Sequence, residues 1–113
     1  MDELIEVPSG QEVRLQEVIQ GERGPSGLTV RYRFVAPEIG DEGDVDFEAA
    51  SEDLAYLCDT YAVPRIPSIG PQPSQIIVSM SDRETPFGAA TPEAVQYFEA
   101  FSVVDGKCVW EAF

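Results

Sequence analysis

The sequence predicts an α+β domain in which one amphipathic helix packs on one face of an antiparallel sheet of about five strands. Several short runs alternate between apolar and polar residues, as strands with one buried face do. A central segment switches to helical periodicity, and Asp105-Gly106 separates two alternating runs near the carboxyl end. The expected order is β-β-α-β-β-β, with residues 1–113 forming a single domain.

The first two strands are expected to form an antiparallel hairpin. Apolar residues at alternate positions predict a strand over residues 12–19, and a clearer alternation predicts a second strand over residues 28–34. Between them, residues 21–27 hold three glycines and a proline, which favour a loop.

The helix is expected to begin at Asp46, after an acidic, glycine-containing loop over residues 37–44. The Asp46 side chain can cap the first turn, and Pro64 marks the end of the helix. Glu48, Glu52, Asp53 and Asp59 are placed off the apolar stripe. That stripe consists of Phe47, Ala50, Leu54, Leu57, Cys58 and Tyr61.

An extended, proline-rich connection over residues 64–73 is predicted to lead into an interior strand over residues 75–80. A long loop over residues 81–91 follows, and Thr91 could then begin one helical turn.

Asp105-Gly106 indicates a type I′ turn, which fixes the register of a terminal hairpin. Val104 should face Lys107, Val103 should face Cys108, Phe101 should face Trp110, and Glu99 should face Ala112. The side expected to meet the core then carries Tyr97, Phe101, Val103, Cys108 and Trp110.

The two cysteines lie on the two surfaces that should bury each other, Cys58 on the helix and Cys108 on the hairpin. A disulfide between them would close a loop of about 50 residues and stabilise the fold by roughly 3–4 kcal/mol. Such a bond indicates an oxidising compartment. The alternative is two buried free thiols in a reduced protein.

The charge balance limits the possible partners. With 21 acidic and seven basic residues, the net charge is -14, which disfavours direct binding to nucleic acid or anionic membranes and favours a soluble monomer. A protein with a basic patch is the partner class that this surface permits. No run is long and apolar enough to predict a transmembrane helix.

The sequence contains no catalytic constellation. Histidine is absent, so catalytic triads that use it are excluded, and neither a phosphate-binding glycine loop nor a four-ligand zinc set is present. We expect no cofactor and no metal. The acids of residues 41–48 are interpreted as a solvated loop and helix cap, because their spacing does not match a calcium loop. Glu99 is expected at the edge of the core, paired with an arginine such as Arg31 or Arg33.

The loop over residues 81–88 is the one candidate contact surface, because it combines acids and an arginine with an apolar side chain. Asp82, Arg83 and Phe87 are its candidate contact residues. The plainer interpretation is that Asp82 and Arg83 brace the turn while Phe87 covers the edge of the sheet.

Several short segments spread along the chain carry a resemblance to known sequences. They are residues 7–11 (VPSGQ), 28–37, 57–58, 61–65 (YAVPR), 70–73 (GPQP), 81–83, 86–88 (PFG) and 108–111 (CVWE). In these segments, and over nearly the whole chain, the sequence resembles a family of small, uncharacterised bacterial proteins of unknown function. Members of that family are typically exported, which implies a periplasmic domain with oxidised cysteines. This sequence departs from that pattern, because its first residues show no export signal. The family transfers no catalytic residue.

The leading hypothesis is therefore a non-enzymatic periplasmic domain that binds a protein or serves an envelope complex. One alternative is a cytoplasmic acidic inhibitor that mimics the charge of nucleic acid. The other is a hydrolase built on two carboxylates, for which Glu99 is the candidate.

Overall fold

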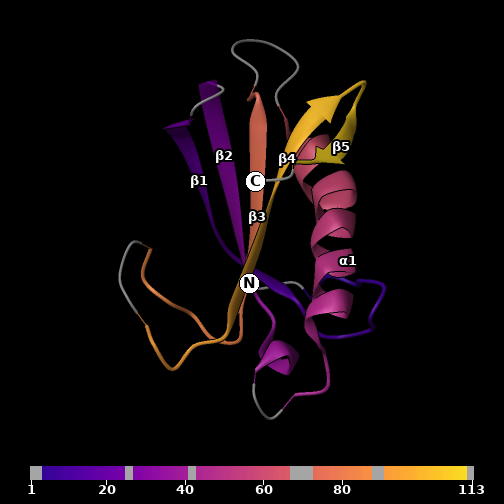
Figure 1. Ribbon diagram of the computed structural model, residues 1–113, viewed down its shortest axis with the longest axis vertical. Helices are drawn as coiled ribbons and strands as arrows, with labels where there is room; N and C mark the ends of the chain where they lie inside the picture. Colours follow the sequence, from indigo (N-terminus) through magenta and orange to yellow (C-terminus); the bar gives the residue numbers. More distant parts are fainter. Residues whose placement is uncertain (1–3, 25–26, 41–42, 67–72, 88–90, 112–113) are drawn as a thin grey trace.

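The computed structural model describes residues 4–24, 27–40, 43–66, 73–87 and 91–111. One helix, α1 (Phe47–Leu57), accompanies a five-stranded sheet (Figure 1). The strands lie in the sheet in their chain order, and they are β1 (Arg14–Gly24), β2 (Gly27–Val35), β3 (Gln75–Ser81), β4 (Gln96–Val104) and β5 (Lys107–Trp110). The predicted α+β class and the order β-β-α-β-β-β are confirmed.

One strand pair of the sheet, which was predicted to be antiparallel, is parallel. Strands β2 and β3 pair in parallel, with Val30 opposite Ile76 and Phe34 opposite Met80, whereas the other three pairs are antiparallel. The physical reason is the helix between them. The chain leaves β2 at one end and travels back along the sheet as α1, so β3 begins beside the start of β2.

The first hairpin is longer than predicted. Strand β1 continues through Gly24, so most of the predicted loop over residues 21–27 is strand, and residues 25–26 lie outside the described residues. The ladder between β1 and β2 shifts register between Leu15 and Glu17 and again between Ile19 and Glu22. Irregularities of this kind interrupt the alternation of a strand, which is why the pattern fades after Ile19.

Asp46 caps α1 as predicted, because its Oδ1 accepts a hydrogen bond from the Ala49 amide at 3.0 Å. Beyond α1 the chain widens into one π-helical turn, η2 (Cys58–Ala62), and then tightens into a 3-10 turn, η3 (Val63–Arg65). The helical segment ends at Arg65, within one residue of Pro64, and Pro64 itself lies inside the last turn.

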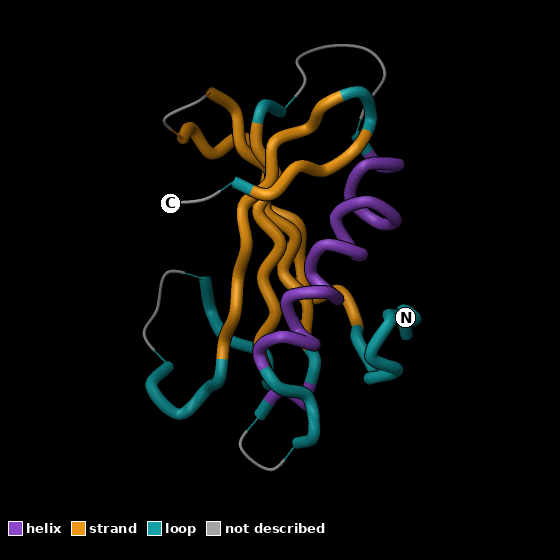
Figure 2. Tube along the Cα trace, turned by 45° about the vertical axis from the view of Figure 1, so that its right-hand side comes forward, coloured by secondary structure: helices purple, strands orange, loops and turns teal. Residues whose placement is uncertain are grey.

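The core lies between α1 and one face of the sheet (Figures 1 and 2). Tyr61, from η2, packs its ring edge-on against Tyr32 and Phe34, with ring centroids 6.1 Å and 5.5 Å away. The predicted stripe is correct except at Phe47, which is 53% exposed. Fully buried side chains on the two surfaces include Ala50, Leu54 and Leu57 from α1 and Ile76, Val78 and Met80 from β3.

The terminal hairpin has the predicted register and turn. Val104 faces Lys107, Val103 faces Cys108 and Phe101 faces Trp110. Asp105 and Gly106 have φ values of 51° and 76°, as a type I′ turn requires. The partner predicted for Glu99, Ala112, lies outside the described residues.

Trp110 lies on the same side of the hairpin as Phe101, as predicted, but it is not buried in the core, because its side chain is 60% exposed. The indole Nε1 instead donates a hydrogen bond to Glu99 Oε2 at 2.6 Å. An indole satisfied in this way can remain at the surface of an edge strand.

The remaining segments are short. The predicted loop over residues 37–44 contains the 3-10 turn η1 (Pro37–Ile39). At Thr91, where a helical turn was expected, the chain forms a hydrogen-bonded turn in which the Ala94 amide donates to the Thr91 carbonyl at 3.0 Å. Residues 67–72 of the proline-rich connection lie outside the described residues. No helix in the described part of the chain is long and apolar enough to cross a membrane.

Candidate functional site

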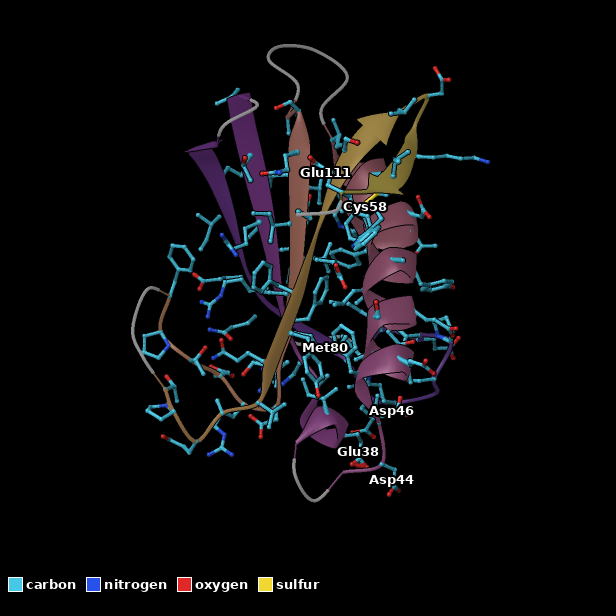
Figure 3. All side chains as sticks on the ribbon, in the orientation of Figure 1. Glu38, Asp44, Asp46, Cys58, Met80 and Glu111 are labelled. Carbon is cyan, nitrogen blue, oxygen red and sulfur yellow. A yellow bond between two sulfur atoms is a disulfide. The ribbon has the colours of Figure 1, made fainter. Side chains whose placement is uncertain are left out.

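The two cysteines form the predicted disulfide. Their Cα atoms are 6.1 Å apart, and the bond joins the first residue of η2 to β5 across 50 positions of sequence. Figure 3 shows the sulfur bond where the helix meets the terminal hairpin. In the structure neither cysteine is a free thiol. The amide of Cys108 also donates to Asp59 Oδ1 at 2.8 Å, so a carboxylate satisfies one backbone group of this edge strand.

A pocket of about 240 Å³ lies on the face of the sheet opposite α1. The loop between β3 and β4 extends from the lower end of the sheet, away from the helix (Figures 1 and 2), and it forms one wall of the pocket. The pocket's lining includes Arg31, Arg33, Ser79, Ser81, Phe87 and Phe98.

Two arginines of β2 mark this pocket. Both guanidinium groups lie over the ring of Phe87, with Cζ 5.1 Å from the ring centroid for Arg31 and 5.4 Å for Arg33. Contacts of this kind are favourable because the negative face of the ring attracts a cation. The described residues lining the pocket include no aspartate or glutamate, although acids outnumber bases three to one in the chain.

Thr85 fixes the loop to the sheet. It is 3% exposed, and both its carbonyl and its hydroxyl accept hydrogen bonds from Arg33 Nη2, at 3.0 Å and 2.9 Å. Gln16 Nε2 donates to the same carbonyl at 2.9 Å, and Arg33 Nη1 pairs with Glu17. The loop therefore stands on β1 and β2 through one buried threonine, which the sequence analysis did not identify.

The three candidate contact residues have different surroundings. Arg83 is half exposed, and its guanidinium binds the largely buried carboxylate of Asp82 through two hydrogen bonds of 3.1 Å. Asp82 Oδ1 also accepts from the Val95 amide at 3.2 Å. These contacts correspond to the bracing of the turn considered above. Phe87 is 49% exposed and covers the two arginines on the face of the sheet.

The Arg83 hydrogen bond is the main cause that lowers the pKa of Asp82 below its ordinary value of 3.8. Partial burial opposes that shift, and the Val95 amide adds to it.

Glu99 does not have the arginine partner expected for it. Its Oε1 accepts from the Ser51 hydroxyl at 3.2 Å, and its Oε2 accepts from Trp110. Glu99 lies opposite Val78 on the helix side of the sheet, whereas Arg31 and Arg33 lie on the pocket side. Because successive residues of a strand point to opposite faces, the predicted pair could not form.

Comparison with known proteins identifies the family to which the chain belongs. A family model described as a family of unknown function (DUF6497) matches residues 1–113. The chain belongs to the DUF6497 family. No curated protein and no solved structure matches it.

The DUF6497 domain also holds a buried carboxylate that the sequence analysis placed outside the core. Asp53 of α1 is fully buried. It accepts hydrogen bonds from the Ser9 amide at 3.0 Å, from the Ser9 hydroxyl and from Gln11 Nε2 at 2.7 Å. A carboxylate inside a protein requires such donors, and these three tie the amino-terminal segment to the helix.

The acids at the start of α1 remain without an assigned ligand. Figure 3 shows Glu38, Asp44 and Asp46 at that end of the DUF6497 domain. Within the described ranges, no group of three or more histidine, cysteine, aspartate or glutamate side chains could hold a metal ion. Asp41 and Glu42, which belong to the predicted solvated loop, lie outside those ranges.

Proposed function

We propose that this DUF6497 domain is a non-enzymatic, protein-binding accessory of a bacterial envelope complex and works in the periplasm. The observation that carries the proposal is a set of large apolar side chains left exposed on the terminal hairpin and on the loop before it. These are Phe87, Phe98, Val104, Val109 and Trp110, each between 47% and 60% exposed. The strand register places Phe98, Val104 and Val109 on the face of the sheet opposite α1 and Trp110 on the helix side. Exposed apolar side chains are typical of contact surfaces, and aromatic residues are enriched in them.

The disulfide supports the compartment. Structural disulfides persist in oxidising compartments and are rare where thiols are kept reduced. The Cys58–Cys108 bond anchors β5, the strand that carries Val109 and Trp110. An oxidised bond would therefore hold part of the proposed contact surface in place.

Charge supports the class of partner. The net charge of -14 would speed the approach of a protein with a basic patch and would oppose association between copies of this chain. We therefore propose a monomer that binds a basic partner through these apolar side chains.

Site-specific photo-crosslinking in the envelope of producing cells tests this surface. A photoreactive residue in place of Phe98 should give one discrete adduct with a protein that carries a basic surface. The matched control replaces Tyr56, which is 41% exposed on α1. Adducts of equal yield at both positions, no adduct at Phe98, or an adduct with a second copy of this chain would overturn the proposed surface.

The compartment needs a separate measurement, in which thiols are alkylated in intact cells before lysis. In the periplasm, Cys58 and Cys108 should resist alkylation until a reductant is added. Free thiols in cells, together with salt-sensitive competition against DNA for a basic protein, would favour the cytoplasmic charge mimic instead.

A further inference from the structure

We propose that a second pocket, formed by residues 4–7 and 10–12, binds a guanidinium group carried on an alkyl chain. The pocket has a volume of about 450 Å³ and lies in the amino-terminal segment, which Ser9 and Gln11 tie to α1 through Asp53 (Figures 1 and 2). The guanidinium would belong either to an arginine side chain of a polypeptide or to a small molecule. The proposal stands on this pocket alone and does not require the protein partner proposed above.

The charge of the lining indicates a cation. Glu6 and Glu12 line the pocket from its two walls, and both are exposed. The described lining includes no lysine or arginine, and the ion pairs found among the described residues involve neither of these glutamates. In a chain of net charge -14, however, acids occur over much of the sequence, so the two carboxylates alone do not define a site.

A buried acceptor without a donor distinguishes this pocket from the other acids of the chain. Gln11 lines the pocket, is only 7% exposed, and has no hydrogen-bond partner for its Oε1 within the described residues. Its Nε2 donates to Asp53 at 2.7 Å and to Met80 Sδ at 3.7 Å, so exchanging the two ends of the amide would set two acceptors against each other. An unpaired buried oxygen costs free energy. A ligand that brings an N–H group into the pocket would supply its partner.

A guanidinium fits these acceptors better than an ammonium does. It is planar and carries five N–H donors, so one group can serve two carboxylates and an amide oxygen together. It is also more weakly hydrated, which lowers the cost of placing it against a partly apolar wall. That wall is formed by Leu4, Ile5 and Val7, and Leu4 is 61% exposed, so an alkyl chain would shield apolar surface from water.

Backbone hydrogen bonds hold the two walls in place. The Ile5 amide donates to the Val13 carbonyl at 2.7 Å, and the Gly10 amide donates to the Val7 carbonyl at 2.9 Å. Gly10 has a φ of 81°, a conformation that favours glycine in the turn between the walls. Binding would therefore cost little further ordering of the chain.

Nuclear magnetic resonance titration with N-acetyl-arginine amide tests the site, with the neutral N-acetyl-citrulline amide as the matched ligand. We expect the arginine ligand to bind with a Kd of about 1 mM, as the efficiency of small ligands allows. The citrulline ligand should bind about tenfold more weakly, because it lacks the charge that strengthens the hydrogen bonds to the carboxylates. N-acetyl-lysine amide should also bind more weakly than the arginine ligand. The side-chain carbonyl resonance of Gln11 should shift as Oε1 gains its donor.

Three variants give the specificity. Glu12→Gln should weaken binding of the arginine ligand about tenfold and leave binding of the citrulline ligand unchanged. Glu93→Gln makes the same change at an exposed position outside the pocket, in the loop before β4, and should have no effect. Leu4→Ala, at a 61% exposed position where folding is not at risk, should weaken both ligands.

Two further ligands, acetyl-Ala-Arg-Ala-amide and free arginine, distinguish the two sources. Binding of the peptide at least as tight as that of free arginine indicates a polypeptide, and weaker binding of the peptide indicates a small molecule.

Several outcomes would overturn the proposal. The charge or shape assigned to the ligand is wrong if the citrulline or the lysine ligand binds as tightly as the arginine ligand. The pocket is wrong if no resonance of its lining shifts at about 10 mM ligand, or if Glu93→Gln weakens binding as much as Glu12→Gln does. Shifts at Glu6 and Glu12 without one at the Gln11 side chain would mean that the cation meets surface acids only.

Discussion

Cys58 and Cys108 join the helical segment to the last strand of the sheet, two elements that are otherwise held together by apolar packing and by the bond from the Cys108 amide to Asp59. Strand β5 is only four residues long and pairs with β4 alone. The disulfide is therefore a covalent link between this edge strand and the helical segment that packs on the core.

Replacing both cysteines by alanine should lower the free energy of unfolding by about 4 kcal/mol, because the unfolded chain regains the entropy of a 50-residue loop. Urea denaturation with and without reductant measures this. The wild-type domain with its disulfide reduced should match the double variant. An unfolding midpoint that reduction leaves unchanged would show that the bond contributes nothing to stability.

Asp53 should be among the most sensitive positions of the helix. Asp53→Ala removes the acceptor of three hydrogen bonds and leaves the Gln11 amide group buried without that partner, which should cost about 2–4 kcal/mol of stability. Urea denaturation gives the cost. Hydrogen exchange should also show lost protection of the Ser9 amide.

Glu52→Ala, one position earlier and exposed, is the matched control and should stay within about 0.5 kcal/mol of wild type. Equal effects of the two substitutions would contradict the role assigned to Asp53.

Thr85→Val should loosen the loop over the pocket. Valine keeps the shape and the carbonyl bonds but loses the hydroxyl that accepts from Arg33 and Gln96, at a cost of about 1–2 kcal/mol. Thermal denaturation measures the loss. Thr60→Val removes a hydroxyl that donates to the Tyr56 carbonyl at an exposed position, and it should cost less than about 0.5 kcal/mol. A larger loss of stability for Thr60→Val than for Thr85→Val would contradict the role of the Thr85 hydroxyl in holding the loop to the sheet.

Alternation and turn chemistry were enough to predict the strands and the terminal hairpin, because a two-residue turn leaves only one register. They were not enough for the pairing of β2 with β3. The predicted helix between those strands did indicate a parallel pair. A chain that leaves one strand and travels back along the sheet as a helix can place the next strand parallel to the first.

The site was harder to predict, for reasons that differ among its residues. Asp53 lies three positions after Ala50 and four before Leu57, so helical spacing places it on the buried face, and only its charge argued against burial. No sequence pattern indicated a role for Thr85, because threonine is common in loops and its hydrogen-bond donors are known only from the structure. Phe87 was found from composition, but its position over Arg31 and Arg33 depends on the long-range anchoring of the loop.

The pH dependence of stability should reveal the contacts of Asp82. Because the Arg83 hydrogen bond lowers its pKa in the folded state, ionised Asp82 stabilises the fold at pH values above its ordinary pKa of 3.8. That stabilisation is lost as the pH falls through the lower pKa of the folded state. Asp82→Asn should therefore be less stable than wild type at neutral pH, by about 1 kcal/mol, and the difference should shrink toward zero in acid.

Urea denaturation across a pH series measures this difference. Asp44→Asn removes the same charge at an exposed position and relieves the same long-range repulsion, so it serves as the matched control. The stability of Asp44→Asn relative to wild type should not fall as the pH rises from acid to neutral. A stability difference for Asp82→Asn that is constant with pH would mean that the contacts with Arg83 and the Val95 amide do not favour the ionised carboxylate.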